Sequence, residues 1–375
     1  MKKLIKISAA AVAAGVSVML AGCGGCSGNV KNNALTNSNW YTGTSYKGIQ
    51  PSFIKDDPKY ADCSEKILYD VTFRKSLTPN SSYEVEYTGG SFLTEFYATY
   101  YDWNSSLEDY KSDEKELVYC YKTELNIKVQ FTIKSSGDKS EVFSDKVVNE
   151  CYFRAAGKNL QPVYSVQTVK STTPANYQAT SLDNAYFNVD CEYRNYYKKD
   201  CSEVTTVTTE TGKQPQTETV GLNKINNSVF DNSSLYIAAR SMKLSESLSQ
   251  NISLYSPAAG GVSAYALKGG NVALGDEERK AVSKKLEDAK LYTPVTKDED
   301  GNDVEDKGIE SVSVSVSYAG GSLQGTTQTI WYAAIKDADN NQSRATMLKL
   351  SVPLSYNLGV LDFNINEIQS TLWNE

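Results

Sequence analysis

Residues 117–134 read LVYCYKTELNIKVQFTIK, and the fold class rests on this stretch. Its odd positions, from Leu117 to Ile133, are apolar or aromatic except for Thr123, and its even positions from Lys122 onward are polar or charged. This period of two continues well beyond the length of an ordinary strand, so it predicts a long β-strand with one buried and one solvated face. At about 3.3 Å per residue, the strand would be on the order of 50 Å long.

The chain repeats this pattern after short turns. Ser135–Asp138 has the composition of a turn, and the apolar alternation then returns over residues 142–153. Comparable segments occupy residues 186–197, 203–209, 312–318, 329–335, 347–352 and 360–365. Because such short turns join antiparallel neighbours, the sequence predicts a mainly β fold. We expect a large curved antiparallel sheet or half-barrel with one or two accessory helices.

Two segments have helical rather than strand periodicity. Residues 231–242 begin with a capping cluster at Asp231 and place Leu235, Ala238 and Met242 on one face, which predicts a helix packed on the sheet. Residues 276–291 are predicted to start at Asp276 as the cap and have only a thin apolar stripe. Because an acidic run follows this second segment, we expect a helical, acidic surface insertion near residues 275–308.

The N-terminus resembles a bacterial lipoprotein signal. Three lysines come first, an apolar run extends from Ile7 to Leu20, and Leu20-Ala-Gly-Cys23 follows. An uncleaved membrane anchor is disfavoured because the run is shorter than the ~20 residues that span a bilayer. We therefore expect residues 1–22 to be a signal peptide and Cys23 to carry the lipid, with a palmitate-type acyl chain holding the protein on the extracytoplasmic face of the cell membrane.

The remainder divides into a tether and a body. Residues 23–50 are rich in Gly, Ser, Asn and Thr without an apolar period, which is typical of a flexible tether. Residues 51–375 are predicted to form a single large antiparallel β domain.

Composition excludes several classes of function. The formal net charge is −7, and removal of the signal would take away three lysines and no acid, so nucleic acid is not an expected partner. The chain contains no histidine, which excludes Ser-His-Asp and Cys-His catalysis and histidine-containing zinc sites. Carboxylate-pair catalysis, Ser/Lys chemistry and all-oxygen metal sites remain open, but no motif supports them. We expect a protein that is not an enzyme and has no cofactor and no metal.

Six cysteines remain besides Cys23. Outside the cytoplasm they could form three disulfides, or they could remain free buried thiols. The sequence leaves both alternatives open for Cys26, Cys63, Cys120, Cys151, Cys191 and Cys201.

Aromatic residues are the most suggestive group of side chains. In residues 91–103, Phe92, Phe96 and Tyr100 share one strand face, whereas Tyr97, Tyr101 and Trp103 share the other. One face must belong to the core. The second, with Tyr97, Tyr101 and Trp103, is a candidate surface for sugar rings or acyl chains. The alternative is that tyrosine is simply a good strand former.

Three further segments carry a family resemblance. Residues 230–242 (FDNSSLYIAARSM), Trp331-Tyr332 and residues 358–361 (LGVL), set among long strands behind a lipoprotein signal, resemble the half-barrel lipoprotein-carrier (LolA/LolB-like) superfamily. The resemblance extends over residues 65–365. It implies a curved sheet whose concave apolar side binds an acyl chain or another hydrophobe.

These expectations define the predicted function. The chain would be a membrane-anchored extracytoplasmic lipoprotein that binds a hydrophobic ligand, such as an acyl chain or lipid, or an envelope protein on its concave sheet. One alternative is glycan binding through exposed tyrosine and tryptophan. A second is a structural or assembly role without a small-molecule ligand.

Overall fold

The computed structural model describes residues 64–103, 115–154, 161–222, 229–240, 249–258, 261–270, 272–297, 300–318, 327–336, 343–354 and 357–371. The strands are β1 (Ser64–Lys75), β2 (Tyr83–Asp102), β3 (Lys115–Ile133), β4 (Phe143–Arg154), β5 (Pro162–Pro174), β6 (Tyr186–Tyr197), β7 (Glu203–Glu210), β8 (Gln216–Gly221), β9 (Val229–Asp231), β10 (Ser249–Ser256), β11 (Gly261–Gly270), β12 (Val312–Tyr318), β13 (Thr327–Lys336), β14 (Ser343–Pro353) and β15 (Gly359–Thr371). The helical elements are α4 (Leu182–Ala185), η3 (Asn232–Ser234), α5 (Leu235–Arg240) and α6 (Asp276–Asp288).

All these strands belong to one sheet of 15 strands, which confirms the mainly β, curved-sheet prediction. The order runs from β8 down to β1, then from β15 down to β9, so the first and last strands pair in the middle. Neighbouring strands are antiparallel except for β9 and β10, which are parallel. The sheet is thus two meanders joined along β1 and β15.

The long predicted strand is present as β3, and its partner β2 has 20 residues. A bulge interrupts their pairing between Thr88 and Ser91, where Gly89 has a φ of +58°. A side chain at Gly90 would place its Cβ 2.7 Å from the Cβ of Val71 on β1. Glycine is required at this bulge because the Val71 and Ile127 side chains leave no room there for a Cβ.

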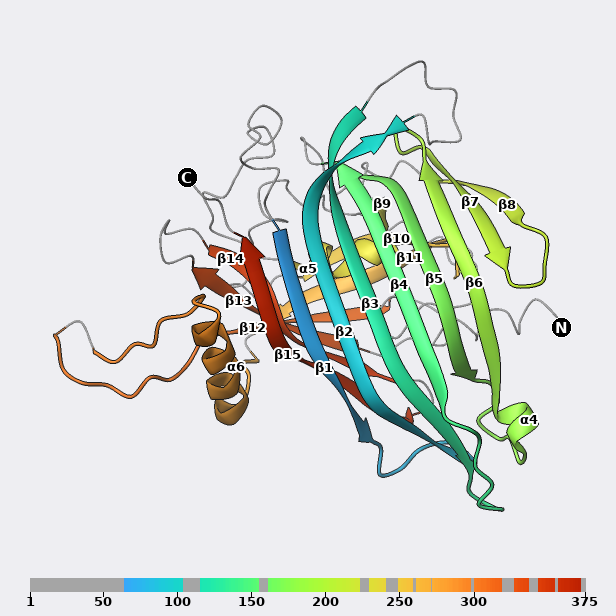
Figure 1. The fold of residues 1–375 in the computed structure, drawn as a ribbon, viewed down its shortest axis with the longest axis horizontal. Coiled ribbons are helices and arrows are strands. Elements are labelled where there is room, and N and C mark those ends of the chain that lie inside the picture. Colours follow the sequence, from blue (N-terminus) through green and yellow to red (C-terminus); the bar gives the residue numbers. More distant parts are fainter. Residues whose placement is uncertain are drawn as a thin grey trace.

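The sheet curls so that β9–β14 lie behind β1–β6, with α5 between the two parts (Figure 1). One cluster of buried side chains joins both parts. Phe92 on β2 lies 5.2 Å from Phe363 on β15 between ring centroids, and the Tyr332 hydroxyl on β13 donates to the Tyr236 carbonyl of α5. The core therefore occupies the concave side.

Side chains rather than a backbone ladder connect the two ends of the curled sheet. The Asp231 carboxylate on β9 accepts hydrogen bonds from Ser165 on β5 and Tyr197 on β6, both at 2.5 Å. The hydroxyls of Thr206 on β7 and Tyr255 on β10 are also 2.5 Å apart. We call these five side chains the polar seam. They hold β9 and β10 against β5–β7, although β8 and β9 do not pair.

Of the two predicted helices, the second is shorter than predicted, and the end of the first lies outside the described residues. The 231–242 segment begins with the 3₁₀ turn η3, capped by Asp231, and α5 is six residues long; Met242 lies outside the described residues. The second helix ends at Asp288, and its cap is Gly275, so the prediction of Asp276 as the cap is wrong. Asp276 is already the first helical residue, one position inside the cap, and its carboxylate pairs with Arg279 at 2.9 Å.

α6 lies on the outside of the sheet beside β15 (Figure 1). Val282 and Leu286 are buried against the core, and the Lys285 ammonium donates to the Ile365 carbonyl at 2.7 Å. Part of the acidic run, residues 298 and 299, lies outside the described residues. The described residues 300–308 are mostly exposed, as expected for a surface insertion.

Several predictions fall on segments that are not described. These are the signal and tether, including Cys23, and the cysteines Cys26 and Cys63. In the part of the chain that is described, Cys120, Cys151, Cys191 and Cys201 are all free thiols. None of the helices in that part has the length and apolarity needed to cross a membrane.

Candidate binding surface on the outer face of β2–β6

The two faces of β2 differ as the sequence indicated. Phe92 and Phe96 point into the core, whereas Tyr97, Tyr101 and Trp103 lie on the outer face. Tyr97 is half-buried, but Tyr101 is 7% exposed and Trp103 fully buried. Of the three predicted ligand-binding residues, Tyr97 alone presents an appreciable part of its ring to solvent.

Trp103 is held by its surroundings rather than displayed. Its indole N–H donates to the Glu116 carboxylate at 3.0 Å, and its ring packs edge-to-face on Tyr101 with centroids 5.1 Å apart. The Arg154 guanidinium lies 5.5 Å above the ring and forms an ion pair with Glu116. These contacts make Trp103 a support for the aromatic surface beside it.

Four tyrosines lie in register across five neighbouring strands. Tyr97 on β2 is opposite Cys120 on β3, which is opposite Tyr152 on β4; Tyr164 on β5 and Tyr196 on β6 follow. All four rings are half-buried. The centroids of Tyr152 and Tyr164 are 5.9 Å apart, and those of Tyr164 and Tyr196 are 5.2 Å apart. We call Tyr97, Tyr152, Tyr164 and Tyr196 the tyrosine row.

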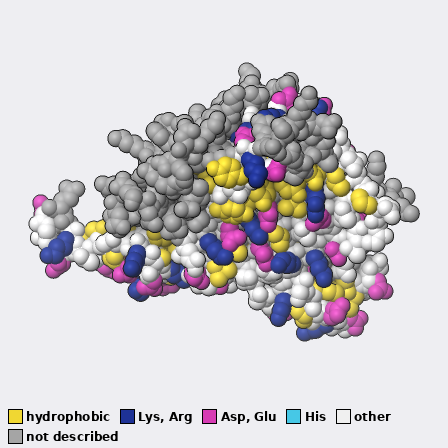
Figure 2. Space-filling view, turned by 45° about the horizontal axis from the view of Figure 1, so that its top comes forward, with side chains coloured by type: hydrophobic (Ala, Val, Ile, Leu, Met, Phe, Trp, Pro, Cys, Tyr) yellow, Lys and Arg dark blue, Asp and Glu magenta, His cyan; other side chains and the backbone are white. Residues whose placement is uncertain are grey.

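A row of alternating charges runs beside the tyrosine row, two residues along each strand. Lys66, Glu95, Lys122 and Glu150 are in register across β1–β4. Lys66 and Glu95 are 2.8 Å apart, and Lys122 and Glu150 are 3.0 Å apart. Figure 2 shows this face, with hydrophobic side chains gathered at its upper part and both signs of charge mixed below them. We call these four residues the charge ladder.

Burial raises the pKa of three hydroxyls of the tyrosine row, those of Tyr97, Tyr152 and Tyr164, so they remain protonated at neutral pH. Burial raises the pKa of Tyr164 to about 12, and burial together with the Cys120 hydrogen bond raises the pKa of Tyr97. Burial also raises the pKa of the Cys120 thiol to about 12, so this thiol is not a nucleophile at neutral pH. The surface therefore offers aromatic rings with neutral hydroxyls that donate and accept hydrogen bonds.

The concave side is occupied by side chains. Every residue of α5 is buried there, and its last residue, Arg240, forms an ion pair with Glu65 of β1 at 2.5 Å. Thr346 donates to the same Glu65 carboxylate at 3.3 Å. Core side chains and α5 therefore pack between the two parts of the sheet in the described interior.

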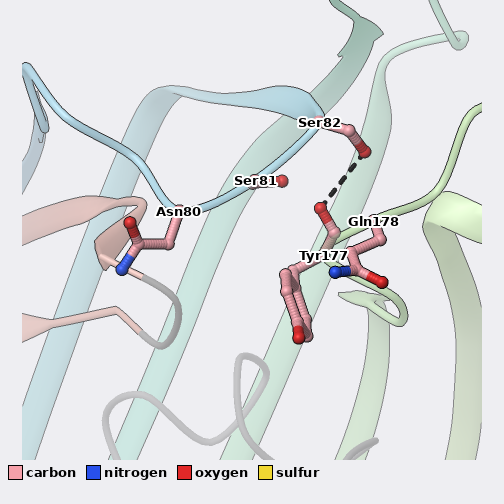
Figure 3. A pocket seen from close by; sticks show the side chains of 5 residues that line it. All are labelled: Asn80, Ser81, Ser82, Tyr177 and Gln178. Carbon is pink, nitrogen blue, oxygen red and sulfur yellow. Dashed lines mark hydrogen bonds between the residues drawn. The ribbon is translucent and has the colours of Figure 1, made fainter.

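A shallow hollow lies at the opposite end of β2, between the β1–β2 and β5–β6 loops (Figure 3). Its volume is about 730 Å³, and it is lined by Asn80, Ser81, Ser82, Tyr177 and Gln178. The Ser82 amide and hydroxyl both donate to the Tyr177 carbonyl, at 2.7 and 3.1 Å, which fixes the two loops together. The lining has one aromatic ring and no charged residue, so it is a weaker candidate than the tyrosine row.

Tyr152, Tyr164 and Tyr196 could not be assigned to a site from the sequence. Each occupies an alternating position in its own strand, but only the pairing register places the three beside Tyr97.

Among the described residues, no group of three or more Asp, Glu, Cys or His side chains is arranged to hold a metal ion.

Comparisons with known proteins assign no family to the chain. No protein-family model matches the sequence, and no curated protein sequence matches it. Among solved structures, a β-barrel-like protein of a domain of unknown function, DUF1849, from Brucella abortus aligns with 83% of this chain and 98% of its own. The two are 10% identical, with a TM-score of 0.43. The chain is a mainly β protein built on one curled, unclosed sheet of 15 strands.

Proposed function

We propose that this chain is a lipid-anchored extracytoplasmic binding protein, not an enzyme, whose tyrosine row binds glycans. The register of four half-buried tyrosines on the outer face carries the proposal. Tyrosine combines an apolar ring with a polar tip, which matches the apolar ring faces and hydroxyl edges of sugars.

The filled concave side favours this function over uptake of an acyl chain. A hydrophobic ligand on the concave sheet would have to displace buried groups such as Phe92, Tyr332 and α5. Removing core contacts of that kind costs several kcal/mol for each large side chain. The resemblance to lipoprotein carriers stays a prediction. Solvent extraction of the purified protein, followed by mass spectrometry, tests whether it carries lipid.

Glycan binding can be tested by affinity electrophoresis in gels that contain soluble polysaccharides. The full-length chain, purified in detergent, should migrate more slowly in at least one such gel than in a gel without polysaccharide. Unchanged mobility in every gel would remove the glycan proposal. Capture of a single envelope protein together with unchanged mobility would favour the assembly role instead.

The lipid anchor has a separate test. Intact-mass spectrometry of the N-terminal peptide should find Cys23 as the first residue, with an added acyl mass. A Cys23→Ser variant should move from the membrane fraction to the soluble fraction, because the acyl chains supply the membrane affinity. An unmodified Cys23 in the membrane fraction would contradict this part of the proposal.

A further inference from the structure

We infer that the ligand of the tyrosine row is an extended, uncharged polysaccharide that lies across strands β2–β6. This inference rests on the proposed function and specifies the substrate class of the same surface. Three features of the outer face support it: the continuous register of the row across neighbouring strands, the balance of its charges and the chemistry of its hydroxyls.

The tyrosine row crosses five neighbouring strands in one continuous register. Neighbouring strands are about 4.8 Å apart, so the five strands from β2 to β6 carry the row over roughly 19 Å. Aromatic rings occupy four of the five register positions, with Cys120 at the remaining one. A single sugar would contact one or two rings, whereas a chain of several sugars would contact all four.

The charges beside the row compensate one another. In the charge ladder each Lys neighbours a Glu, and on β6 Arg194 pairs with Glu192 at 2.6 Å. At the far side of the row Arg154 pairs with Glu116 at 3.0 Å. A charged polymer would have to break these ion pairs to form its own, and it would meet the opposite sign at the next strand. An uncharged chain can bind without breaking these ion pairs.

Hydrogen-bonding groups lie on both sides of the rings. The tyrosine hydroxyls donate and accept hydrogen bonds, and the charged side chains of Lys122 and Glu150 lie in the neighbouring register row. Sugar hydroxyls both donate and accept, so they fit a surface with carboxylates, ammonium groups and phenols close together. Lipids and apolar peptides lack this density of hydroxyls and would leave the charge ladder poorly solvated.

Chain length and charge of the ligand provide the test. We propose isothermal titration calorimetry of the full-length chain in detergent with gluco-, manno- and xylo-oligosaccharides of two and six units, and with an oligogalacturonate as the charged counterpart. At least one uncharged hexamer should bind about tenfold or more tightly than its dimer, a difference of about 1.4 kcal/mol, because the hexamer reaches rings of the row that a dimer cannot. The oligogalacturonate should bind no more tightly than the dimers.

Matched variants locate the site. Tyr152→Ala combined with Tyr164→Ala should remove the length preference, whereas Tyr100→Ala should leave it unchanged, because Tyr100 is 64% exposed but points to the other face of β2. Tyr164→Phe keeps the aromatic ring and should retain most of the affinity. Its binding would show that the ring of residue 164, rather than its hydroxyl, contributes the contact that the alanine variants lose.

The outcomes distinguish the two proposals. Equal affinity for dimer and hexamer, or a preference for the oligogalacturonate, would overturn the extended, uncharged ligand while glycan binding stands. Absence of binding to every saccharide, together with unchanged mobility in polysaccharide gels, would overturn both. A length preference that survives the double substitution would place the glycan elsewhere and contradict the inference.

Discussion

At the scale of single residues, the Glu65–Arg240 pair shows how the interior tolerates charge. Both side chains are 3% exposed, and Thr346 adds a hydrogen bond to the carboxylate. The guanidinium Nε and Nη1 find no hydrogen-bond partner among the described residues, so the pair is only partly satisfied. Such a pair contributes little net stability, yet either half alone is costly, because a lone charge is then left buried.

This asymmetry predicts the effect of substitution. Arg240→Met should lower the free energy of unfolding by about 3–5 kcal/mol, measured by urea denaturation. Arg240→Met combined with Glu65→Leu should regain most of that loss. A double variant as unstable as the single one would show that the pair itself stabilises the fold.

Gly359 is a residue at which only glycine fits. Its φ is +151°, and an added Cβ would lie 2.5 Å from both the Arg74 carbonyl oxygen and the Phe73 ring. Gly359→Ala should therefore destabilise the protein by about 1–3 kcal/mol. Gly221→Ala is the control, because an added Cβ there meets no atom within 4 Å and should change stability by less than about 0.5 kcal/mol. Equal effects of the two substitutions would contradict the steric argument.

Asp145 predicts a pH dependence of stability. Burial raises the pKa of this carboxyl to about 7, although the Thr172 amide donates to it at 2.9 Å. The folded state then holds its proton up to about pH 7, whereas the unfolded chain releases it near pH 4. Stability should therefore fall as the pH rises from about 4 to 7, by on the order of 2–4 kcal/mol.

The matched variant is Asp145→Asn, whose side-chain oxygen can still accept from the Thr172 amide. The difference in unfolding free energy between the two proteins should change over that pH range and be constant above it. Parallel pH profiles for both proteins would show that Asp145 does not titrate in this range.

At the scale of elements, the polar seam replaces a missing strand pairing. β8 and β9 end the sheet without pairing, and Asp231 instead accepts from Ser165, Tyr197 and the Ser233 amide. Asp231→Ala would leave these buried donors without their acceptor, at about 1–3 kcal/mol for each.

Hydrogen exchange of β10 measures the seam directly. Asp231→Ala should accelerate exchange of the β10 amides by tenfold or more, because the seam holds β9 and β10 against β5–β7. Thr205→Val removes a hydrogen bond on the exposed side of β7, to Thr219, and should leave β10 unchanged. Slow exchange in β10 of the Asp231 variant would show that the core alone closes the fold.

Local patterns predicted individual elements well. β3 and β6 follow from alternation within their own residues, because a half-buried strand imposes a period of two. The helical segment that follows Asp231 was likewise anticipated by its capping cluster and apolar face, and all six residues of α5 are buried. Properties that depend on a single segment were therefore accessible from the sequence.

Pairing between distant segments could not be predicted from the sequence. β1 and β15 pair through contacts such as Phe73 with Leu361, which lie at opposite ends of the described chain. The tyrosine row likewise depends on the register of β2–β6, and a shift of one residue in any strand would turn its tyrosine to the inner face. Sequence reasoning therefore found Tyr97 and missed its three partners.

At the scale of the whole molecule, the curled sheet has core side chains on its concave face and the tyrosine row and charge ladder on its outer face. The chain enters the sheet at Ser64, which is in register with Tyr97 at the head of the tyrosine row. The hollow of Figure 3 lies at the other end of β2.

Hydroxyl-radical footprinting with mass spectrometry tests the central claim, that the ligand binds outside the sheet and not within it. The full-length chain would be labelled with and without the tightest-binding oligosaccharide. A ligand on the tyrosine row should protect Tyr97, Tyr152, Tyr164 and Tyr196 and leave the labelling of Tyr100 and Tyr177 unchanged. Unchanged labelling of the tyrosine row, with altered labelling of core residues such as Tyr332 or Phe363, would contradict it.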